Sequence, residues 1–158
     1  MAHQYNAKVN WSRGGASFTD QRYSREHMWT FDGGIQVKAS SSPLSVKLPY
    51  SVAEAVDPEE ALVAALASCH MLTFLYVAAK QGFVVDDYAD DAVGEMTKNE
   101  HGKLWVSRII LSPAIKFTGD KRPSPEQLHE LHHLAHEECY IANSIKGEVV
   151  VEGTMSFV

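Results

Sequence analysis

The two cysteines are the side chains in this sequence best suited to covalent chemistry. The chain contains only Cys69 and Cys139, which are separated by 70 positions. A single stapling disulfide is unusual in a reducing compartment, so the pair is either two inert core thiols or a working redox couple. Free cysteine commonly behaves as a small buried hydrophobe, and the residue type alone does not decide between the two interpretations.

A reactive cysteine also needs a nearby cation, because burial without one disfavours the thiolate. Arg25 lies shortly before a predicted hairpin turn, and Arg22 and Arg13 are its competitors. A lone arginine beside serine or glycine is more often a solvated surface residue. The residues alone do not decide which of these arginines lies beside a thiol.

Four histidines on a predicted helix form a second group with metal-binding chemistry. The pairs His129/His133 and His132/His136 each have the four-residue spacing of metal ligands on one helix face. No zinc-protease signature with an intervening glutamate joins them. The default interpretation is that His129, His133 and His136 form a partly solvated helix edge, and the alternative is a metal-binding module.

Composition and charge exclude several classes of function. The length of 158 residues fits one compact domain, and 14 basic against 20 acidic residues give a net charge of −6, which is unsuited to a phosphate backbone. The longest unbroken apolar run covers only residues 61–67, and the start lacks the order of a signal peptide. We expect a single domain over residues 1–158, located in the cytoplasm, with neither nucleic acid nor a membrane as partner.

A long helix must position Cys69. Asp57 is a suitable N-cap and Pro58 a suitable first residue for a helix over residues 57–81, which ends at a lysine and a glycine. This segment is apolar almost all round, which predicts a helix inside the structure with Cys69 in apolar surroundings. His70 points to another side of that helix, which argues against a Cys-His hydrolase dyad.

Strand patterns flank this helix, and a second helix carries Cys139. Ser124 and Pro125 start that helix, which extends to about residue 138. Alternating or β-rich segments predict strands over residues 4–12, on both sides of the turn 32–34, and over 44–48, 90–98, 103–117 and 147–158. The order favours an α+β fold in which the apolar helix needs more cover than one small sheet provides. A dimer would supply that cover.

Several of these features together resemble the OsmC/Ohr family of thiol-dependent peroxidases. Asp57-Pro58-Glu59-Glu60 leads through an alanine-rich run into Ala67-Ser68-Cys69-His70-Met71, and the cysteine stands ten residues after Glu59. A second cysteine near the end of the second helix also matches, although Tyr140 follows it where such proteins often have proline. The resemblance extends over nearly the whole chain, including Phe31-Asp32-Gly33-Gly34.

The resemblance implies an α+β, OsmC-like fold: β-sheets packed around a long buried central helix plus a second helix, in an intertwined homodimer. It also implies a peroxidatic thiolate, a resolving thiol, and an arginine that a glutamate holds beside the thiolate. By position these are Cys69, Cys139, Arg25 and Glu59, with Arg22 as the alternative arginine. Ten residues of helix span ~15 Å, so Glu59 and Cys69 cannot meet on one unbroken helix, and the subunit interface would complete the site.

The implied reaction reduces organic hydroperoxides, in preference to hydrogen peroxide, with a small dithiol or a lipoyl-type reductant and with no cofactor or metal. Two other hypotheses remain open. One is a binding protein of the OsmC fold whose cysteines are inactive, and the other is the histidine-rich metal-binding module.

Overall fold

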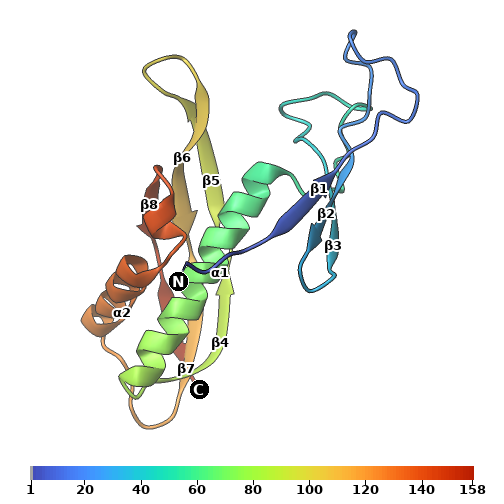
Figure 1. Ribbon diagram of the computed structural model, residues 1–158. Helices are drawn as coiled ribbons and strands as arrows, with labels where there is room; N and C mark the ends of the chain where they lie inside the picture. The colour runs from blue at the N-terminus through green and yellow to red at the C-terminus, as the bar shows by residue number, and fades with distance from the viewer. Residues whose placement is uncertain (1) are drawn as a thin grey trace. The chain divides into compact units, whose positions relative to one another are not determined.

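The computed structural model describes residues 2–158 and contains two α-helices and three three-stranded sheets (Figure 1). The predicted α+β class is confirmed. The chain divides into two compact units, one ending at Ala61 and the other beginning at Leu62. The expectation of a single domain over residues 1–158 stays a prediction, and each unit is described by itself.

The first unit contains the antiparallel sheet β1-β2-β3. Its strands are β1 (Ala7–Asn10), β2 (His27–Phe31) and β3 (Gln36–Ala39). Gly34 adopts a φ of 85° in the turn between β2 and β3, and its N–H donates to the Phe31 carbonyl at 2.9 Å. The predicted hairpin is therefore confirmed, whereas the first strand is shorter than the predicted 4–12.

The predicted edge strand over residues 44–48 is wrong, because this segment forms local turns. The Leu44 N–H donates to the Ser42 hydroxyl, and the Ser45 N–H donates to the Ser42 carbonyl. The Ser51 hydroxyl donates to the Val46 carbonyl at 2.6 Å. Serine side chains and nearby carbonyls thus satisfy the backbone, and no partner strand is needed.

Helix α1 (Pro58–Lys80) confirms the helix predicted over residues 57–81. At its start the Glu60 N–H donates to the Asp57 carboxylate at 2.8 Å, and the Asp57 N–H donates to the Glu60 carboxylate at 3.1 Å. At its end the Phe83 N–H donates to the Ala78 carbonyl, and Gly82 adopts a φ of 79°. Both ends of α1 are therefore fixed by local hydrogen bonds.

Within one chain α1 is buried along one face and not all round as expected. The buried residues follow helical spacing: Leu66, His70, Phe74, Val77 and Ala78. On the opposite face Leu72 is 61% exposed and Tyr76 is 67% exposed. By length and composition alone α1 could cross a membrane, but core helices pass the same test, and one face of α1 lies in the core.

The second unit contains two further sheets and the second helix. One sheet has the order β4-β7-β9 and the other β5-β6-β8. The strands are β4 (Val84–Asp90), β5 (Val93–Lys98), β6 (Leu104–Leu111), β7 (Pro113–Thr118), β8 (Glu148–Val151) and β9 (Thr154–Phe157). Helix α2 (Pro125–Glu138) begins with a capping box between Ser124 and Gln127, and a 3-10 turn, η1 (Ala142–Ser144), follows it. The second helix is confirmed as predicted.

Three features of these sheets differ from the sequence-based expectation. The predicted strand 103–117 is interrupted at Ser112, whose N–H donates to the Asp90 carboxylate, so β6 and β7 belong to different sheets. The predicted strand 147–158 is interrupted at Glu152 and Gly153, so β8 pairs with β6 and β9 pairs with β7, both in parallel. Strand β4 was not predicted, because its acidic residues hide its pattern.

Two apolar clusters form the core of the second unit. In the first, Phe74 and Val77 of α1 and Leu131 of α2 pack with β7. In the second, Leu66 of α1 packs with β6 and with Cys139. Both helices therefore share a core with the sheets, and the second cluster contains the thiols.

Candidate functional site

The two cysteines, 70 positions apart in the sequence, meet in the second unit. Both are free thiols, and Cys69 packs against the apolar cluster that contains Cys139, close enough to raise the pKa of the Cys139 thiol. Cys139 is 0% exposed and packs with Ile109 and Leu111, whereas Cys69 is half-buried. The structure thus brings together the two thiols that the sequence marked as a candidate redox couple.

The environment of Cys139 holds its thiol protonated. Burial, followed by the neighbouring Cys69 side chain, raises the pKa of Cys139 to about 11. Backbone N–H groups of Ile141 and Ala142 act in the opposite direction, and that of Ala142 donates to Sγ at 3.4 Å. Cys139 is therefore a thiol at neutral pH, with two N–H groups placed to stabilise negative charge on its sulfur.

The end of α2 produces this arrangement. Cys139 caps the helix with an extended backbone, and its carbonyl accepts from the Asn143 N–H at 3.1 Å. The chain turns directly into η1, which directs the Ala142 N–H at the sulfur. Tyr140, which directly follows Cys139, is 78% exposed.

Arg25 and Glu59 line one cavity of about 430 Å³ in the first unit. Aromatic and serine side chains complete its wall: Trp11, Phe18, Tyr23, Ser40, Ser41, Ser42 and Ser45, together with His27 and Pro58. Arg25 is half-buried, whereas Arg22 and Arg13 are exposed and do not contribute to the lining. Of the three candidate arginines, Arg25 is therefore the one that lines this cavity.

Backbone carbonyls, rather than Glu59, hold the Arg25 side chain in the single chain. Its Nη1 donates to the carbonyls of Gln21 and Tyr23 at 2.7 and 2.6 Å. Among residues 2–158 no ion pair joins Arg25 to Glu59. Helix α1 has no break between Glu59 and Cys69, in keeping with the expectation that these two do not meet along one helix. The glutamate clamp stays a prediction.

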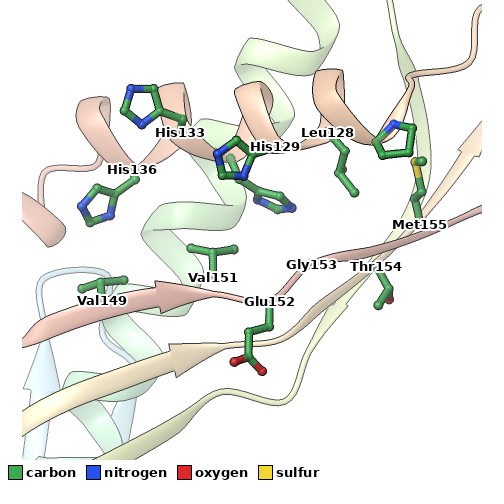
Figure 2. A pocket seen from close by; sticks show the side chains of 12 residues that line it. Leu128, His129, His133, His136, Val149, Val151, Glu152, Gly153, Thr154 and Met155 are labelled. Carbon is green, nitrogen blue, oxygen red and sulfur yellow. The ribbon is translucent and has the colours of Figure 1, made fainter.

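The α2 histidines line a different cavity, of about 650 Å³, between α2 and the β8–β9 segment (Figure 2). Figure 2 shows His136 directed toward Val149, and His133 directed away from the strands. His129 and His133 are exposed, as expected for a solvated edge. Within residues 2–158 no group of three or more His, Cys, Asp or Glu side chains is arranged to hold a metal ion.

His132 lies outside that edge and is buried against His70 of α1. The His70 Nε2 and His132 Nδ1 atoms are 3.1 Å apart, and the two rings stack at 13°. Burial is the main cause that lowers the pKa of His70 to about 4, and the charge of His136 contributes less. Burial is also the main cause that lowers the pKa of His132 to about 4, with smaller contributions from the charges of His70 and His129. The pair is therefore neutral at pH 7 and shares one proton in its hydrogen bond.

Comparison with known proteins identifies the family. Residues 51–153, more than half of the chain, match the model of the OsmC-like protein family. The chain belongs to this family. A solved structure of an OsmC-like protein of unknown function from Vibrio cholerae is 51% identical, with a TM-score of 0.93 and coverage of 97% of this chain and 100% of that one. The resemblance to the OsmC/Ohr family is thereby confirmed.

More distant OsmC-like relatives share the fold. The uncharacterized protein YmaD of Bacillus subtilis (strain 168) is 23% identical over 151 residues, which cover 95% of this chain and 91% of YmaD. The structure of the organic hydroperoxide resistance protein OhrB of Bacillus subtilis is 19% identical, covers 98% of each chain and has a TM-score of 0.60. At this identity the likeness to OhrB shows the fold alone.

The OsmC-like match covers some of the candidate residues and leaves others outside. Glu59, Cys69 and Cys139 lie within the matched residues, whereas Arg25 precedes them. Sequence reasoning missed the groups that hold Arg25, which are the ring of Tyr23 and the carbonyl of Gln21. The nearest signal in the sequence is the presence of three aromatic residues between β1 and β2: Trp11, Phe18 and Tyr23.

Proposed function

We propose that this protein is a thiol-dependent peroxidase that reduces organic hydroperoxides to alcohols through Cys69 and Cys139. The observation that carries the proposal is the contact between the two thiols in an apolar cluster. Membership of the OsmC-like family and the name of its structural neighbour OhrB, an organic hydroperoxide resistance protein, support the same reaction class.

The reaction proceeds in three balanced steps. The Cys69 thiolate attacks one peroxide oxygen, so an S–O bond forms, the O–O bond breaks and the alkoxide takes up a proton to leave as an alcohol. The Cys139 sulfur then attacks the Cys69 sulfenic acid, an S–S bond forms, and hydroxide leaves as water with the proton of Cys139. A small dithiol, such as a lipoyl group, reduces the disulfide and is itself oxidised to a disulfide.

The environments of the thiols favour this division of roles. Cys69 is half-buried and therefore within reach of a peroxide, whereas Cys139 is fully buried. The raised pKa of Cys139, about 11, makes it a poor first nucleophile at neutral pH. The N–H groups of Ile141 and Ala142 then stabilise its sulfur when it loses the proton during resolution.

Arg25 and Glu59 belong to the same proposal. A guanidinium beside a thiolate favours the charged sulfur and binds peroxide oxygens, and a carboxylate orients the guanidinium. The cavity that contains both residues has an aromatic wall suited to a bulky organic peroxide. We propose that a cytoplasmic homodimer completes the site.

Thiol counting combined with mass spectrometry tests the proposed function. After one equivalent of cumene hydroperoxide we expect two thiols per chain to be lost and a Cys69–Cys139 disulfide to appear in the digest, with a slower reaction for hydrogen peroxide. If both cysteines stay free in excess hydroperoxide, the peroxidase proposal fails and the OsmC-fold binding protein with inactive cysteines takes its place.

A further inference from the structure

The Arg25 guanidinium is held from one side by two backbone carbonyls. Two carbonyls from the preceding four residues, those of Gln21 and Tyr23, accept from the same Nη1 atom. Carbonyl oxygens orient a guanidinium without neutralising it as a carboxylate would. No acidic side chain forms an ion pair with Arg25 in the part of the chain that the structure describes. The arginine is therefore oriented and still able to bind an anionic or developing negative group.

A stack of aromatic rings supports the plane of this guanidinium. The Arg25 Cζ atom lies 3.9 Å from the centroid of the Tyr23 ring. The Tyr23 ring stacks on Phe18 at 4.9 Å and meets the edge of Trp11 at 5.3 Å. The Trp11 Nε1 donates to the Ser24 carbonyl at 2.8 Å, which ties the indole to the same loop. The ring beneath Arg25 is thus itself held on two sides.

The backbone at Gln21 adopts an unfavourable conformation that accompanies this contact. Its φ is 63°, and it is the one residue other than glycine with a positive φ in residues 2–158. Residues other than glycine rarely adopt this backbone region, and they do so where the surrounding structure holds them in it. In this conformation the Gln21 carbonyl accepts a hydrogen bond from Arg25, and the Gln21 N–H donates to the Phe18 carbonyl in a turn.

We infer that Tyr23 and Gln21 are positioning residues that hold the Arg25 guanidinium in one orientation before substrate binds. The inference deepens the proposed peroxidase function and rests on it for the role of Arg25. Arginine has a long side chain with many rotamers, and ordering it in advance removes an entropic cost from peroxide binding. Trp11, Phe18 and Tyr23 therefore form part of the cavity wall and also orient the Arg25 guanidinium inside it.

Two matched pairs of variants test this inference. Tyr23→Leu removes the ring face and Gln21→Val disfavours the positive φ, so both are expected to slow single-turnover oxidation of Cys69 by cumene hydroperoxide by on the order of tenfold. Tyr23→Phe keeps the ring, and Gln21→Gly keeps the conformation and the carbonyl. These conservative variants are expected to recover most of the loss. Far-UV circular dichroism establishes that each variant is folded.

A double-mutant cycle separates positioning from a direct contact with substrate. In an Arg25→Ala background, Tyr23→Leu is expected to slow the reaction no further, because its effect passes through the arginine. Equal slowing in both backgrounds would mean that the ring acts on the peroxide itself, and it would overturn the inference.

A readout that needs no peroxide distinguishes failure of this inference from failure of the proposed function. In ¹H–¹⁵N spectra we expect slowly exchanging guanidinium signals from Arg25 that broaden in Tyr23→Leu and in Gln21→Val. The same signals are expected to broaden less in Glu59→Gln, because the contacts with Gln21 and Tyr23 that hold the guanidinium in the single chain are still present. Signals that are unchanged in Tyr23→Leu and Gln21→Val would refute the positioning role, whether or not the protein consumes hydroperoxide.

Discussion

At the scale of single residues, Cys69 and Cys139 are chemically unequal because their surroundings differ. Cys139 is fully enclosed and caps a helix, whereas Cys69 sits in the middle of α1 and is half-buried. A buried thiol with a raised pKa reacts slowly with an incoming peroxide but is well placed to capture a sulfenic acid beside it. This difference is the physical reason for the proposed order of the two oxidation steps.

Single serine substitutions check the order of these steps. Cys69→Ser is expected to lose reaction with hydroperoxide, because the remaining thiol is enclosed and protonated. Cys139→Ser is expected to react once and then to stop as a sulfenic acid or to overoxidise, since no resolving thiol is present. Dimedone labelling followed by mass spectrometry measures the sulfenic acid. Labelling of Cys139 in the Cys69→Ser variant would reverse the assignment.

Residue types and spacing were sufficient to predict the thiols but not what holds Arg25. The spacing between Glu59 and Cys69 and the position of Cys139 can be read directly from the sequence. The support of Arg25 depends on a positive φ at Gln21 and on ring stacking at Tyr23, and neither has a sequence pattern of its own. Tertiary contacts determine such geometry, so the sequence pointed to a glutamate where the single chain uses carbonyls.

At the scale of elements, the His70–His132 hydrogen bond joins the two helices that carry the cysteines. His70 directly follows Cys69 in α1, and His132 lies two turns before Cys139 in α2. The rings also pack against Phe74, whose ring centroid is 4.6 Å from that of His132. Protonation of both imidazoles would place two like charges in this apolar contact.

The pair predicts a loss of stability in mild acid. Both folded-state pKa values are lowered from 6.5 to about 4, so the unfolded chain binds protons first as the pH falls. The free energy of unfolding is expected to be independent of these groups above pH 6.5 and to fall between pH 6.5 and 4, by up to about 1.4 kcal/mol per pH unit for each proton. Urea unfolding at several pH values measures this dependence.

A matched substitution makes the pH experiment specific. His132→Gln is expected to reduce the pH dependence, whereas His133→Gln, at an exposed position of the same helix, is expected to leave it as in the parent. An equal pH dependence in all three proteins would assign the acid sensitivity to other groups.

Gly153 provides a second test at this scale, because it lies directly against the pair. A Cβ at residue 153 would collide with the His132 Nε2 atom, which leaves no room for a side chain. Gly153→Ala is expected to lower the free energy of unfolding by roughly 1–3 kcal/mol through displacement of His132. Gly33→Ala is the control, since nothing lies within 4 Å of a Cβ there. Similar unfolding curves for both variants would contradict the close approach seen here.

The elements with strong local signals were those that the sequence predicted well. Capping residues fixed both helices, and the two glycines of the β2–β3 turn fixed that hairpin. The strands of the second unit were harder, because β6 continues into β7 through Ser112 without a turn signal. Sheet membership there depends on long-range pairing, which periodicity does not encode.

At the scale of the whole molecule, the outer face of α1 leaves apolar side chains uncovered in the single chain. Leu72 is 61% exposed and Tyr76 is 67% exposed, and both line a cavity of about 810 Å³ that also includes Leu134 and Tyr140. Full burial of such a side chain in an interface is worth about 1.5–3 kcal/mol of favourable free energy relative to exposure to water. A second copy of the chain is the partner that the family resemblance implies for this face.

Sedimentation velocity tests the predicted homodimer. The parent protein is expected to sediment as a dimer across micromolar concentrations, and Leu72→Lys is expected to shift the equilibrium toward monomer because it places a charge in the proposed interface. Leu104→Lys, an exposed position of β6, is expected to leave the dimer intact. A parent protein that is monomeric at these concentrations would remove the homodimer from the proposal.

A disulfide between Cys69 and Cys139 would also give the protein a redox-dependent heat resistance. A bond between these sulfurs would close a loop of about 70 residues containing β4 to β7 and all of α2, and restriction of the unfolded chain by such a loop is worth about 4 kcal/mol. For a chain of this size that corresponds to a rise in Tm of roughly 10 °C. A melting curve recorded with and without a dithiol would therefore report the fraction of oxidised protein in a sample, and coincident curves for fully oxidised and fully reduced protein would contradict this coupling.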